Sequence, residues 1–261
     1  MNVHIFASGS SGNCLCLSSG GSHILIDAGI SMRRTAEALR ELGLELNDIS
    51  GVLITHEHSD HISGLKMLIK HCDIPIYAPH TIANRLRGML PDIEPLLHII
   101  SVGQPFGLGA FLIRAFHTPH DTDESVGYRV EGGGSFAMAT DMGHVTEEVL
   151  EALTGADTVL IEANHDLGLL TDGNYPIYLK RRILSNRGHL SNDSCAGLAL
   201  YLCRHGTRQI VLGHLSRENN RPDLALATVR SKLEGLAVEL HCAPPAGGLS
   251  LAVREAAPCF R

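Results

Sequence analysis

The chain has 261 residues, of which 44% are hydrophobic and 19% charged, a composition that is ordinary for a globular protein with a substantial core. Its formal net charge of −7 argues against broad, non-specific binding to duplex nucleic acid, although a local basic patch could still hold a polyanion. Because the seven cysteines are scattered and no apolar run approaches the roughly 18 residues of a membrane span, we expect a cytoplasmic protein with reduced thiols, no signal peptide and no membrane association.

Short β-rich runs alternate with helical patterns along the first half of the chain. Strands are expected at residues 3–7, 14–18, 23–27, 52–55, 76–78, 99–102, 111–116, 126–131 and 135–139. Helices are expected at residues 32–42, 62–72 and 81–90, and Gly43 ends the first of them.

The second half continues the alternation without a low-complexity segment or a long linker. A helix at 146–153 is capped by Thr146 and ended by Gly155, and a polar connection follows the strand at 157–162. Further helices are expected at 175–184, 191–204 and 222–233, with strands at 209–212 and, last, 237–241. We therefore expect a single α/β domain that spans residues 1–261.

A cluster of metal-ligand side chains follows the expected strand at 52–55. Residues 56–61 read His-Glu-His-Ser-Asp-His, and imidazole nitrogen and carboxylate oxygen are ligands that Zn²⁺ prefers. His56 and His58 are two residues apart on extended backbone and point the same way, whereas Asp60 and His61 begin the next helix and can face a second ion. The loop therefore predicts a site for two metal ions, because its crowded polar groups need a cation to organise them.

Other expected strands also end in side chains of this kind. In chain order the strand ends lead into His56, into His117 and His120, into Asp141, into Glu162 and His165, and into His214. Open α/β sheets place their sites at the carboxyl ends of strands, so we expect these side chains to gather at one edge.

Taken in order, these motifs resemble those of the metallo-β-lactamase superfamily. Its first metal motif is His-x-His-x-Asp-His, as at 56–61, and His120 stands where its next histidine belongs. Residues 140–143 resemble its bridging-aspartate motif, Gly213-His214 its final histidine and residues 25–29 its early Asp-bearing turn. The resemblance covers essentially the whole chain and implies a four-layer αβ/βα sandwich with the site between the sheet edges.

Further segments resemble the YycJ/WalJ group of small nuclease-like hydrolases within that superfamily. They are residues 8–13, 120–121 with 126–128, 162–166, 188–192, and 214–216 with 219–220. One departure is that Thr122, Glu124 and Ser125 follow Asp121 where the group has an alanine and then a proline, which affects the rim of the site and not the ligands.

The resemblance implies a complete set of metal ligands. They are His56, His58 and His120 for one ion, Asp60, His61 and His214 for the other, and Asp141 as the bridge between them. Zn²⁺ is the default for this set, and Mn²⁺ or Fe²⁺ would also fit it. A hydroxide shared by two such cations is a nucleophile at neutral pH, and the cations also clamp a phosphoryl or carbonyl oxygen.

Two choices between histidines affect these assignments. We favour His120 over His117 as the ligand, because Asp121 beside it matches the family and His117 still lies within its strand. His214 and His189 both occur in His-Leu-Ser, but His214 ends an apolar strand, whereas His189 precedes a helix N-terminus, a position that suits a substrate phosphate.

The resemblance also implies catalytic roles outside the metal ligands. In the related tRNase Z enzymes a histidine held by a glutamate looks like the acid for the leaving group, and this role falls to His189 with Glu162 as its partner. The alternative is a helix-capping histidine. Asp60 is the third expected catalytic residue.

The remaining expectations concern the substrate. The expected substrate-binding residues are Asn13, Asn164, His165, Arg182 and Ser216. The basic run Lys180, Arg181, Arg182 and Arg187 either contacts a polyanion or is a solvated helix face. Residues 8–13 are either a phosphate-binding nest or an ordinary turn between strands.

Three functions compete. The first is a metal-dependent phosphodiesterase or nuclease acting on DNA or RNA, which the YycJ/WalJ cues and the basic run near His189 favour. The second is a hydrolase of thioesters, lactones or β-lactams, which the same metal centre could serve. The third, a metal-binding protein without hydrolytic activity, is disfavoured because no ligand position is replaced.

Overall fold

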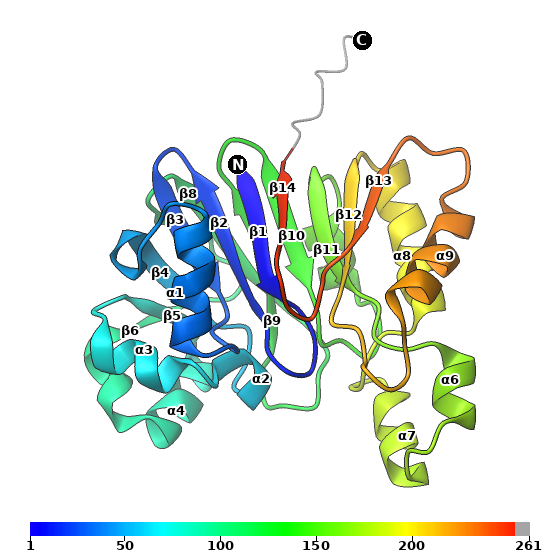
Figure 1. Cartoon of the computed structure of the whole chain (residues 1–261), viewed down its shortest axis with the longest axis horizontal. Coiled ribbons are helices and arrows are strands. Elements are labelled where there is room, and N and C mark those ends of the chain that lie inside the picture. The colour runs from blue at the N-terminus through cyan, green and yellow to red at the C-terminus, as the bar shows by residue number, and fades with distance from the viewer. Residues whose placement is uncertain (254–261) are drawn as a thin grey trace.

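The structure is a computed structural model that describes residues 1–253; the end of the predicted domain, residues 254–261, lies outside the described residues. Within the described part, two seven-stranded sheets face each other and helices cover the outer side of each (Figure 1). The predicted four-layer αβ/βα sandwich is confirmed. Residues 1–253 include no helix with the length and apolar character that a membrane crossing requires.

The first sheet has the strand order β14-β1-β2-β3-β4-β5-β6. Its strands are β14 (Leu249–Ala252), β1 (Asn2–Ala7), β2 (Cys14–Ser19), β3 (Ser22–Ile26), β4 (Ile49–Leu53), β5 (Ile76–Pro79) and β6 (Leu97–Ile100). The strands from β14 to β3 pair antiparallel, and those from β3 to β6 pair parallel.

The second sheet has the order β13-β12-β11-β10-β9-β8-β7. Its strands are β13 (Glu239–Cys242), β12 (Gln209–Gly213), β11 (Thr158–Glu162), β10 (Ser135–Ala139), β9 (Val126–Glu131), β8 (Phe111–His117) and β7 (Phe106–Leu108). Here the strands from β10 to β13 are parallel, and those from β7 to β10 are antiparallel.

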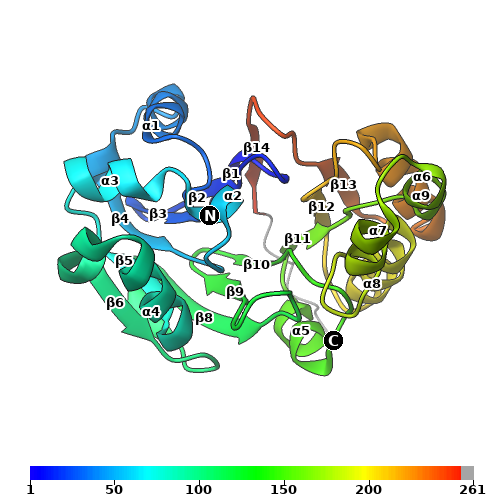
Figure 2. The same cartoon turned by 90° about the horizontal axis from the view of Figure 1, so that it is seen from below.

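Several helices of the described part form the two outer layers, and the others lie at the edge of the sandwich. They are α1 (Met32–Glu41), α2 (Ser59–Ile62), α3 (Leu65–His71), α4 (His80–Met89), α5 (Glu147–Leu153), α6 (Leu167–Asp172), α7 (Ile177–Ile183), α8 (Asn192–Arg204) and α9 (Pro222–Lys232), with 3-10 turns at Leu46–Asp48 and Pro91–Leu96. Figure 2 shows α1, α3 and α4 outside the first sheet and α5, α8 and α9 outside the second. Thr146 caps α5 as predicted, since its side chain accepts the N–H of Val149.

Alternation along the central strands separates two cores. In β10, Phe136 and Met138 pack into the core shared with the first sheet, whereas Ala137 and Ala139 pack against the outer helices. Neighbouring β-strand residues point to opposite faces, so a strand buried on both sides serves both cores. The shared core fixes the separation of the two sheets, and thereby of the loops at their edges.

The structure departs from the sequence predictions in four places. The predicted helix at 62–72 is two helices, α2 and α3, which meet at Gly64, where the chain packs so closely that a Cβ would lie 1.9 Å from the carbonyl oxygen of Ile30. The connection after residue 162 contains the short helix α6, and β7 was not predicted. The last strand is β14 and not the predicted strand at 237–241, because residues 249–252 return to pair with β1.

A glycine beside the 56–61 loop provides a test of this packing. The N–H of Gly29 donates to the carbonyl of Asn13, whose own N–H donates to the carbonyl of Asp60. A Cβ at Gly29 would lie 1.7 Å from that carbonyl oxygen of Asp60. We predict that Gly29→Ala lowers the free energy of unfolding by at least roughly 1–3 kcal/mol, the usual cost of overpacking.

The matched control is Gly88→Ala. Gly88 is exposed in α4, and a Cβ there meets nothing within 4 Å. This change should raise the free energy of unfolding by roughly 0.5–1 kcal/mol because alanine is the better helix former. Chemical denaturation measures both, and similar effects of the two changes would contradict the close packing at Gly29.

Candidate metal centre

The polar side chains that follow the strands converge at one edge of the sandwich. The loop after β4 carries residues 56–61, and the loops after β8, β10 and β12 carry His120, Asp141 and His214. Because β10, β11 and β12 are parallel, their carboxyl ends lie at the same edge. Figure 2 looks onto this edge, where α2 lies near the line between the two sheets.

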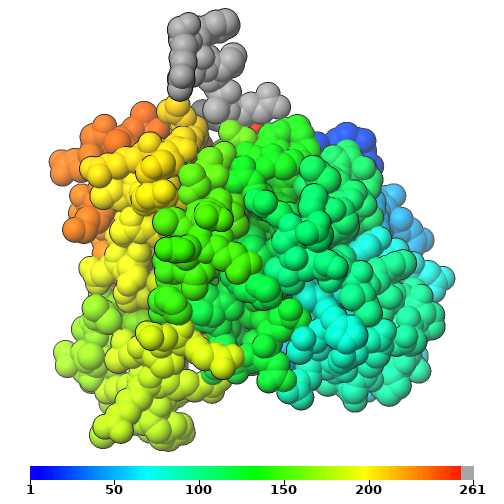
Figure 3. Space-filling view, turned by 180° about the vertical axis from the view of Figure 1, so that it is seen from behind, coloured from blue at the N-terminus to red at the C-terminus, as the bar shows by residue number. Residues whose placement is uncertain are grey.

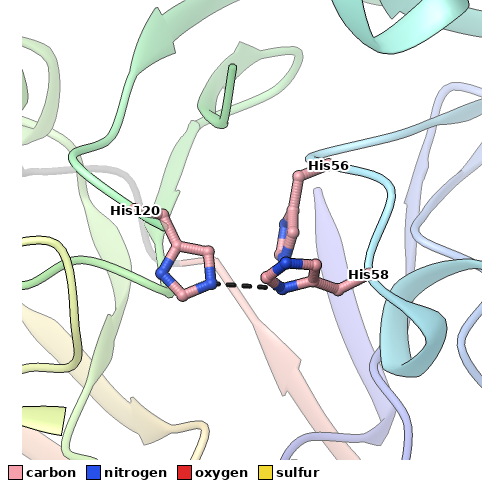
Figure 4. A group of neighbouring side chains, drawn as sticks. All are labelled: His56, His58 and His120. Atoms are coloured by element: carbon pink, nitrogen blue, oxygen red, sulfur yellow. Dashed lines mark hydrogen bonds between the residues drawn. The ribbon is translucent and has the colours of Figure 1, made fainter. Parts of the chain in front are cut away.

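Three histidines from the two halves of the molecule face one another (Figure 4). The ring centroid of His56 lies 4.6 Å from that of His58 and 5.1 Å from that of His120. The Nδ1 atom of His58 is 3.3 Å from Nε2 of His120. One nitrogen from each ring lies within 4.8 Å of the others, close enough for the three to hold one metal ion.

A second group consists of Asp60, His61 and His214. Oδ2 of Asp60 lies 3.6 Å from Nε2 of His61 and 3.5 Å from Nε2 of His214. The ligand atoms of this group also lie within 4.8 Å of one another. The loop after β4 thus contributes residues to both groups, as the spacing of its side chains predicts.

The carboxylate of Asp141 lies between the two groups. Its Oδ2 is 3.3 Å from Nε2 of His61, while its Oδ1 is 3.5 Å from Nε2 of His214 and 3.7 Å from Nε2 of His120. The side chain is 3% exposed. The carboxylate therefore contacts imidazoles of both groups.

Hydrogen bonds on the outer side of the rings orient these imidazoles. The Nδ1 atom of His61 lies 2.7 Å from Oδ2 of Asp27, and that of His214 lies 2.9 Å from Oε1 of Glu162. The Nδ1 atom of His56 lies 3.1 Å from Oγ1 of Thr55, and that of His120 lies 3.3 Å from the carbonyl oxygen of Gly188. In all four rings Nε2 faces the centre, and in His61 it also lies 3.1 Å from Nδ2 of Asn13. Outer contacts of this kind fix the tautomer and orientation of metal-binding histidines.

The donor atoms fit a divalent metal. Nε2 of His56 and Oδ2 of Asp141 are buried and have no hydrogen-bond partner among residues 1–253. Buried polar atoms are seldom left in that state, because an unsatisfied group costs free energy. A cation bound by imidazole nitrogens and carboxylate oxygens would satisfy both atoms.

Charges at the site oppose the effect of burial. Burial alone would raise the pKa of Asp141, but His214 and His61 beside it hold this pKa well below its ordinary value. Burial would likewise lower the pKa of His61, but Asp27 and Asp141 raise it to about 10. At His56 burial prevails and lowers the pKa well below its usual value. The carboxylates therefore create a negative potential that favours bound cations.

Backbone strain is concentrated at the same place. Within residues 1–253, the non-glycine residues with positive φ are Asp27, Asp141 and His214, with φ of 61°, 56° and 54°. Asp27 and His214 lie directly after β3 and β12, Asp141 lies two residues after the end of β10, and each carries a side chain at or beside the centre. Such conformations cost roughly 1–3 kcal/mol each and persist where surrounding contacts enforce them.

His189 lies beside the centre and is held by Glu162. Nδ1 of His189 is 2.7 Å from Oε1 of Glu162, the oxygen that also contacts His214, and 3.8 Å from Oδ1 of Asp141. Burial would raise the pKa of Glu162, but His189 and the donors around the carboxylate lower it. The side chain of His189 is 23% exposed, so its ring borders solvent as well as the centre.

Three of the five expected substrate-binding residues share one cavity. Asn164, Arg182 and Ser216, together with His189, line a cavity of about 190 Å³ beside the metal centre. Arg182 is exposed and pairs with Asp121, and Ser216 is half-buried, whereas Asn164 is 4% exposed and donates to the carbonyl of His214. Arg182 and Ser216 are therefore better placed than Asn164 to contact a substrate.

Asn13 and His165 are placed differently. Asn13 is 8% exposed; its Oδ1 accepts the N–H of Gly9 and its Nδ2 lies 3.1 Å from Nε2 of His61. His165 is 1% exposed, and within residues 1–253 neither of its ring nitrogens has a hydrogen-bond partner. Burial of both side chains argues against direct contact with a substrate, and the hydrogen bonds of Asn13 suit it to support the turn next to His61.

The basic run is only partly available. Lys180 donates to the carbonyl of Thr171, and Arg187 donates to the carbonyl of His120, so both side chains stabilise the local backbone. Arg181 is exposed on α7. Arg187 therefore supports the loop that carries His120 and is less suited to contact a polyanion.

His117 lies apart from the three-histidine group. It is the last residue of β8, its side chain is 54% exposed, and its Nδ1 is 3.2 Å from Oε1 of Glu148. This position favours His120 over His117 as a ligand.

The sequence did not assign a role to Asp27 or Thr55. The buried carboxylate of Asp27 accepts the N–H and the hydroxyl of Thr55 and also contacts His61. The resemblance places Asp27 in the Asp-bearing turn at residues 25–29 without a role, and its position directly after an apolar strand is the same signal that marks the ligands elsewhere. Nothing in the sequence pattern distinguishes Thr55 from other strand residues.

Comparison with known proteins yields relatives over almost the whole chain. Residues 22–215 match the family model of the β-lactamase superfamily domain. The exodeoxyribonuclease YycJ of Bacillus anthracis is 36% identical over 255 residues, which cover 94% of this chain and 97% of the relative. The exodeoxyribonuclease WalJ of Streptococcus pneumoniae is 37% identical over 235 residues, with coverage of 88% and 87%.

Solved structures share the fold at lower identity. Zn²⁺-bound PqqB from Methylobacterium extorquens has a TM-score of 0.74 and 18% identity and covers 96% of this chain and 100% of its own. The short form of human tRNase Z has a TM-score of 0.67 and 18% identity, with coverage of 97% and 100%. At this identity the likeness is one of fold.

We predict that the protein supplied with excess Zn²⁺ carries two ions per chain, as two-metal sites of this kind do. Asp27→Asn should weaken metal binding by roughly 10–100-fold, because His61 loses the charged acceptor that orients its ring. Elemental analysis and competition with a chelating dye measure the two effects.

Asp73→Asn is the control for that change, since Asp73 is an exposed aspartate away from the centre. It should leave metal binding unchanged. One ion or none in the unaltered protein, or equal losses in the two variants, would contradict this description of the centre.

Proposed function

This chain belongs to the β-lactamase superfamily and, within it, to the family of YycJ and WalJ, and we propose that it is a metal-dependent phosphodiesterase that cleaves DNA from its ends. The observation that carries the proposal is the pairing of His189 with Glu162 at 2.7 Å directly beside Asp141. This places a proton donor next to two groups of metal-ligand side chains. The relatives named exodeoxyribonucleases favour DNA over RNA as the substrate.

We propose two divalent cations, Zn²⁺ by default with Mn²⁺ or Fe²⁺ as alternatives. His56, His58 and His120 would hold one, Asp60, His61 and His214 the other, and Asp141 would bridge them. Such cations supply Lewis acidity at a phosphoryl oxygen and a nucleophile at neutral pH. Asp27, Thr55 and Glu162 would keep the imidazoles turned toward them.

His189 would protonate the leaving oxygen. Its Nδ1 donates to Glu162, which leaves Nε2 for the substrate. Burial would lower the pKa of His189, but Glu162 raises it and so favours the protonated ring that an acid requires. A proton given to the departing oxygen as the P–O bond breaks prevents an alkoxide from leaving.

We further propose that the protein acts in the cytoplasm. The cysteines within residues 1–253 are free thiols, as expected in a reducing compartment. The alternative function, hydrolysis of thioesters, lactones or β-lactams, is less supported because the relatives that cover most of the chain are named exodeoxyribonucleases.

We predict that His189→Ala slows cleavage of an oligodeoxynucleotide by roughly 10²–10⁴-fold and leaves the metal content unchanged. Bis-p-nitrophenyl phosphate should be hydrolysed at a rate much closer to normal, because its nitrophenolate leaves without a proton. A structural role for His189 would slow both substrates alike.

His117→Ala is the matched control, because His117 is exposed and outside the centre. It should retain both metal content and cleavage. Loss of a metal ion in His189→Ala, or of cleavage in His117→Ala, would contradict the assignment. Hydrolysis of a lactone or thioester without any cleavage of DNA would overturn the nuclease proposal and leave the metal centre in place.

A separate prediction concerns salt. If the substrate is a polyanion, Arg181→Glu should raise the KM for an oligodeoxynucleotide and reduce the salt dependence of binding by about one released counterion. Arg230→Glu, a reversal of an exposed arginine on α9, should have little effect. If a salt titration shows equal effects of the two reversals, Arg181 and the helix α7 that carries it do not contact the substrate.

A further inference from the structure

The cavity beside His189 has a form that the metal centre alone does not explain. It measures about 190 Å³ and lies between α7 and the turns that carry Ser10 and Ser216. Figure 1 shows α7 at the lower edge of the molecule, and in Figure 3 the yellow-green segment around it projects below the neighbouring surface. The helix therefore forms an outer wall for this cavity.

That wall is apolar and aromatic. Tyr175, Leu179 and Ile183 line the cavity and follow one another at intervals of four residues, which places them along one side of the helix and its entry. Ile177 and Tyr178, which are 69% and 74% exposed, do not line it. α7 thus presents one side to the cavity and another to solvent.

The rest of the cavity is polar. Asn164 and Ser216 lie among its lining residues, and the Arg182 guanidinium pairs with the carboxylate of Asp121 within it. These groups offer donors and acceptors beside an apolar wall. A flat ring with hydrogen-bonding edges matches this combination, because its face packs on the wall and its edge contacts the polar groups.

The cavity borders the metal centre. His189 belongs to both, and its Nδ1 is 3.8 Å from Oδ1 of Asp141. Asp121 also lines the cavity, and its Oδ1 is 3.3 Å from Nε2 of His120. A group bound here is therefore next to a phosphate held at the centre.

We propose that this cavity binds the base of the terminal nucleotide, with Tyr175 and Leu179 as its packing surface, so that the enzyme acts on an unpaired end. The inference rests on the proposed nuclease function. A base within a duplex is stacked and paired, and it must leave the helix before it can enter a cavity of this kind. An unpaired end meets no such barrier.

The test uses a single-stranded oligodeoxythymidylate with an abasic tetrahydrofuran residue at its 5′ end, at its 3′ end or at neither. One of the two abasic ends should lower kcat/KM by roughly 10–100-fold, the usual effect of removing a base–aromatic contact. Tyr175→Ala and Leu179→Ala should cleave the unmodified strand more slowly and discriminate far less between the strands. Tyr175→Phe should restore discrimination. A duplex with a mismatched end should be cleaved faster than a fully paired one.

Tyr178→Ala is the matched control, an aromatic change on the solvent side of the same helix, and it should keep the discrimination. All variants should keep the metal content of the unaltered enzyme, because none of the substituted side chains belongs to a group of metal-ligand residues. Equal cleavage of all three strands by the unaltered enzyme, or discrimination that survives both alanine changes, would overturn the base site and leave the nuclease standing. Hydrolysis of bis-p-nitrophenyl phosphate without cleavage of any strand would overturn both.

Discussion

The buried carboxylate of Asp141 is the charge around which the functional edge is arranged. It lies within 3.7 Å of imidazoles from His61, His120 and His214 and is almost excluded from solvent. A buried charge of this kind costs several kcal/mol unless opposite charge and hydrogen bonds compensate for it. The neighbouring imidazoles and the bound cations that we propose provide that compensation, which also has to offset the strained backbone at Asp141.

Two further buried carboxylates extend the arrangement into the two sheets. Asp27 follows β3 of the first sheet and holds His61, while Glu162 ends β11 of the second and holds both His214 and His189. Each sheet therefore orients its own imidazoles, and the centre forms where the two sets meet. The distance between the sets depends on the core that the sheets share, which is why a site built from short loops can be rigid.

The sequence predicts most of this because strand ends and ligand-type residues are local signals. The strand after which His56 stands, the strand end at Asp141 and the cap at Thr146 can all be read from neighbouring residues. What it does not predict depends on distant contacts. β14 forms because residues 249–252 pair with β1, and the break at Gly64 arises from contact with Ile30. Likewise, Asn13 resembles a substrate ligand until its burial next to His61 is seen, and Arg187 resembles a phosphate contact until it is found bonded to a backbone carbonyl.

Charge explains how an acidic chain could bind a polyanion selectively. The net charge of −7 repels nucleic acid at long range, and much of the basic run is engaged within the protein, Arg182 with Asp121 and Lys180 with the carbonyl of Thr171. Attraction must then come from the proposed cations, from Arg181 and from contacts that do not depend on charge. A wall of Tyr175 and Leu179 beside the centre provides such contacts, because packing against a base does not weaken with salt as phosphate contacts do. An enzyme with weak attraction to phosphates and a packing surface for a base would bind the body of a duplex weakly and an accessible terminal base more firmly. The preference for ends would then follow from the weak electrostatic attraction to the rest of the DNA.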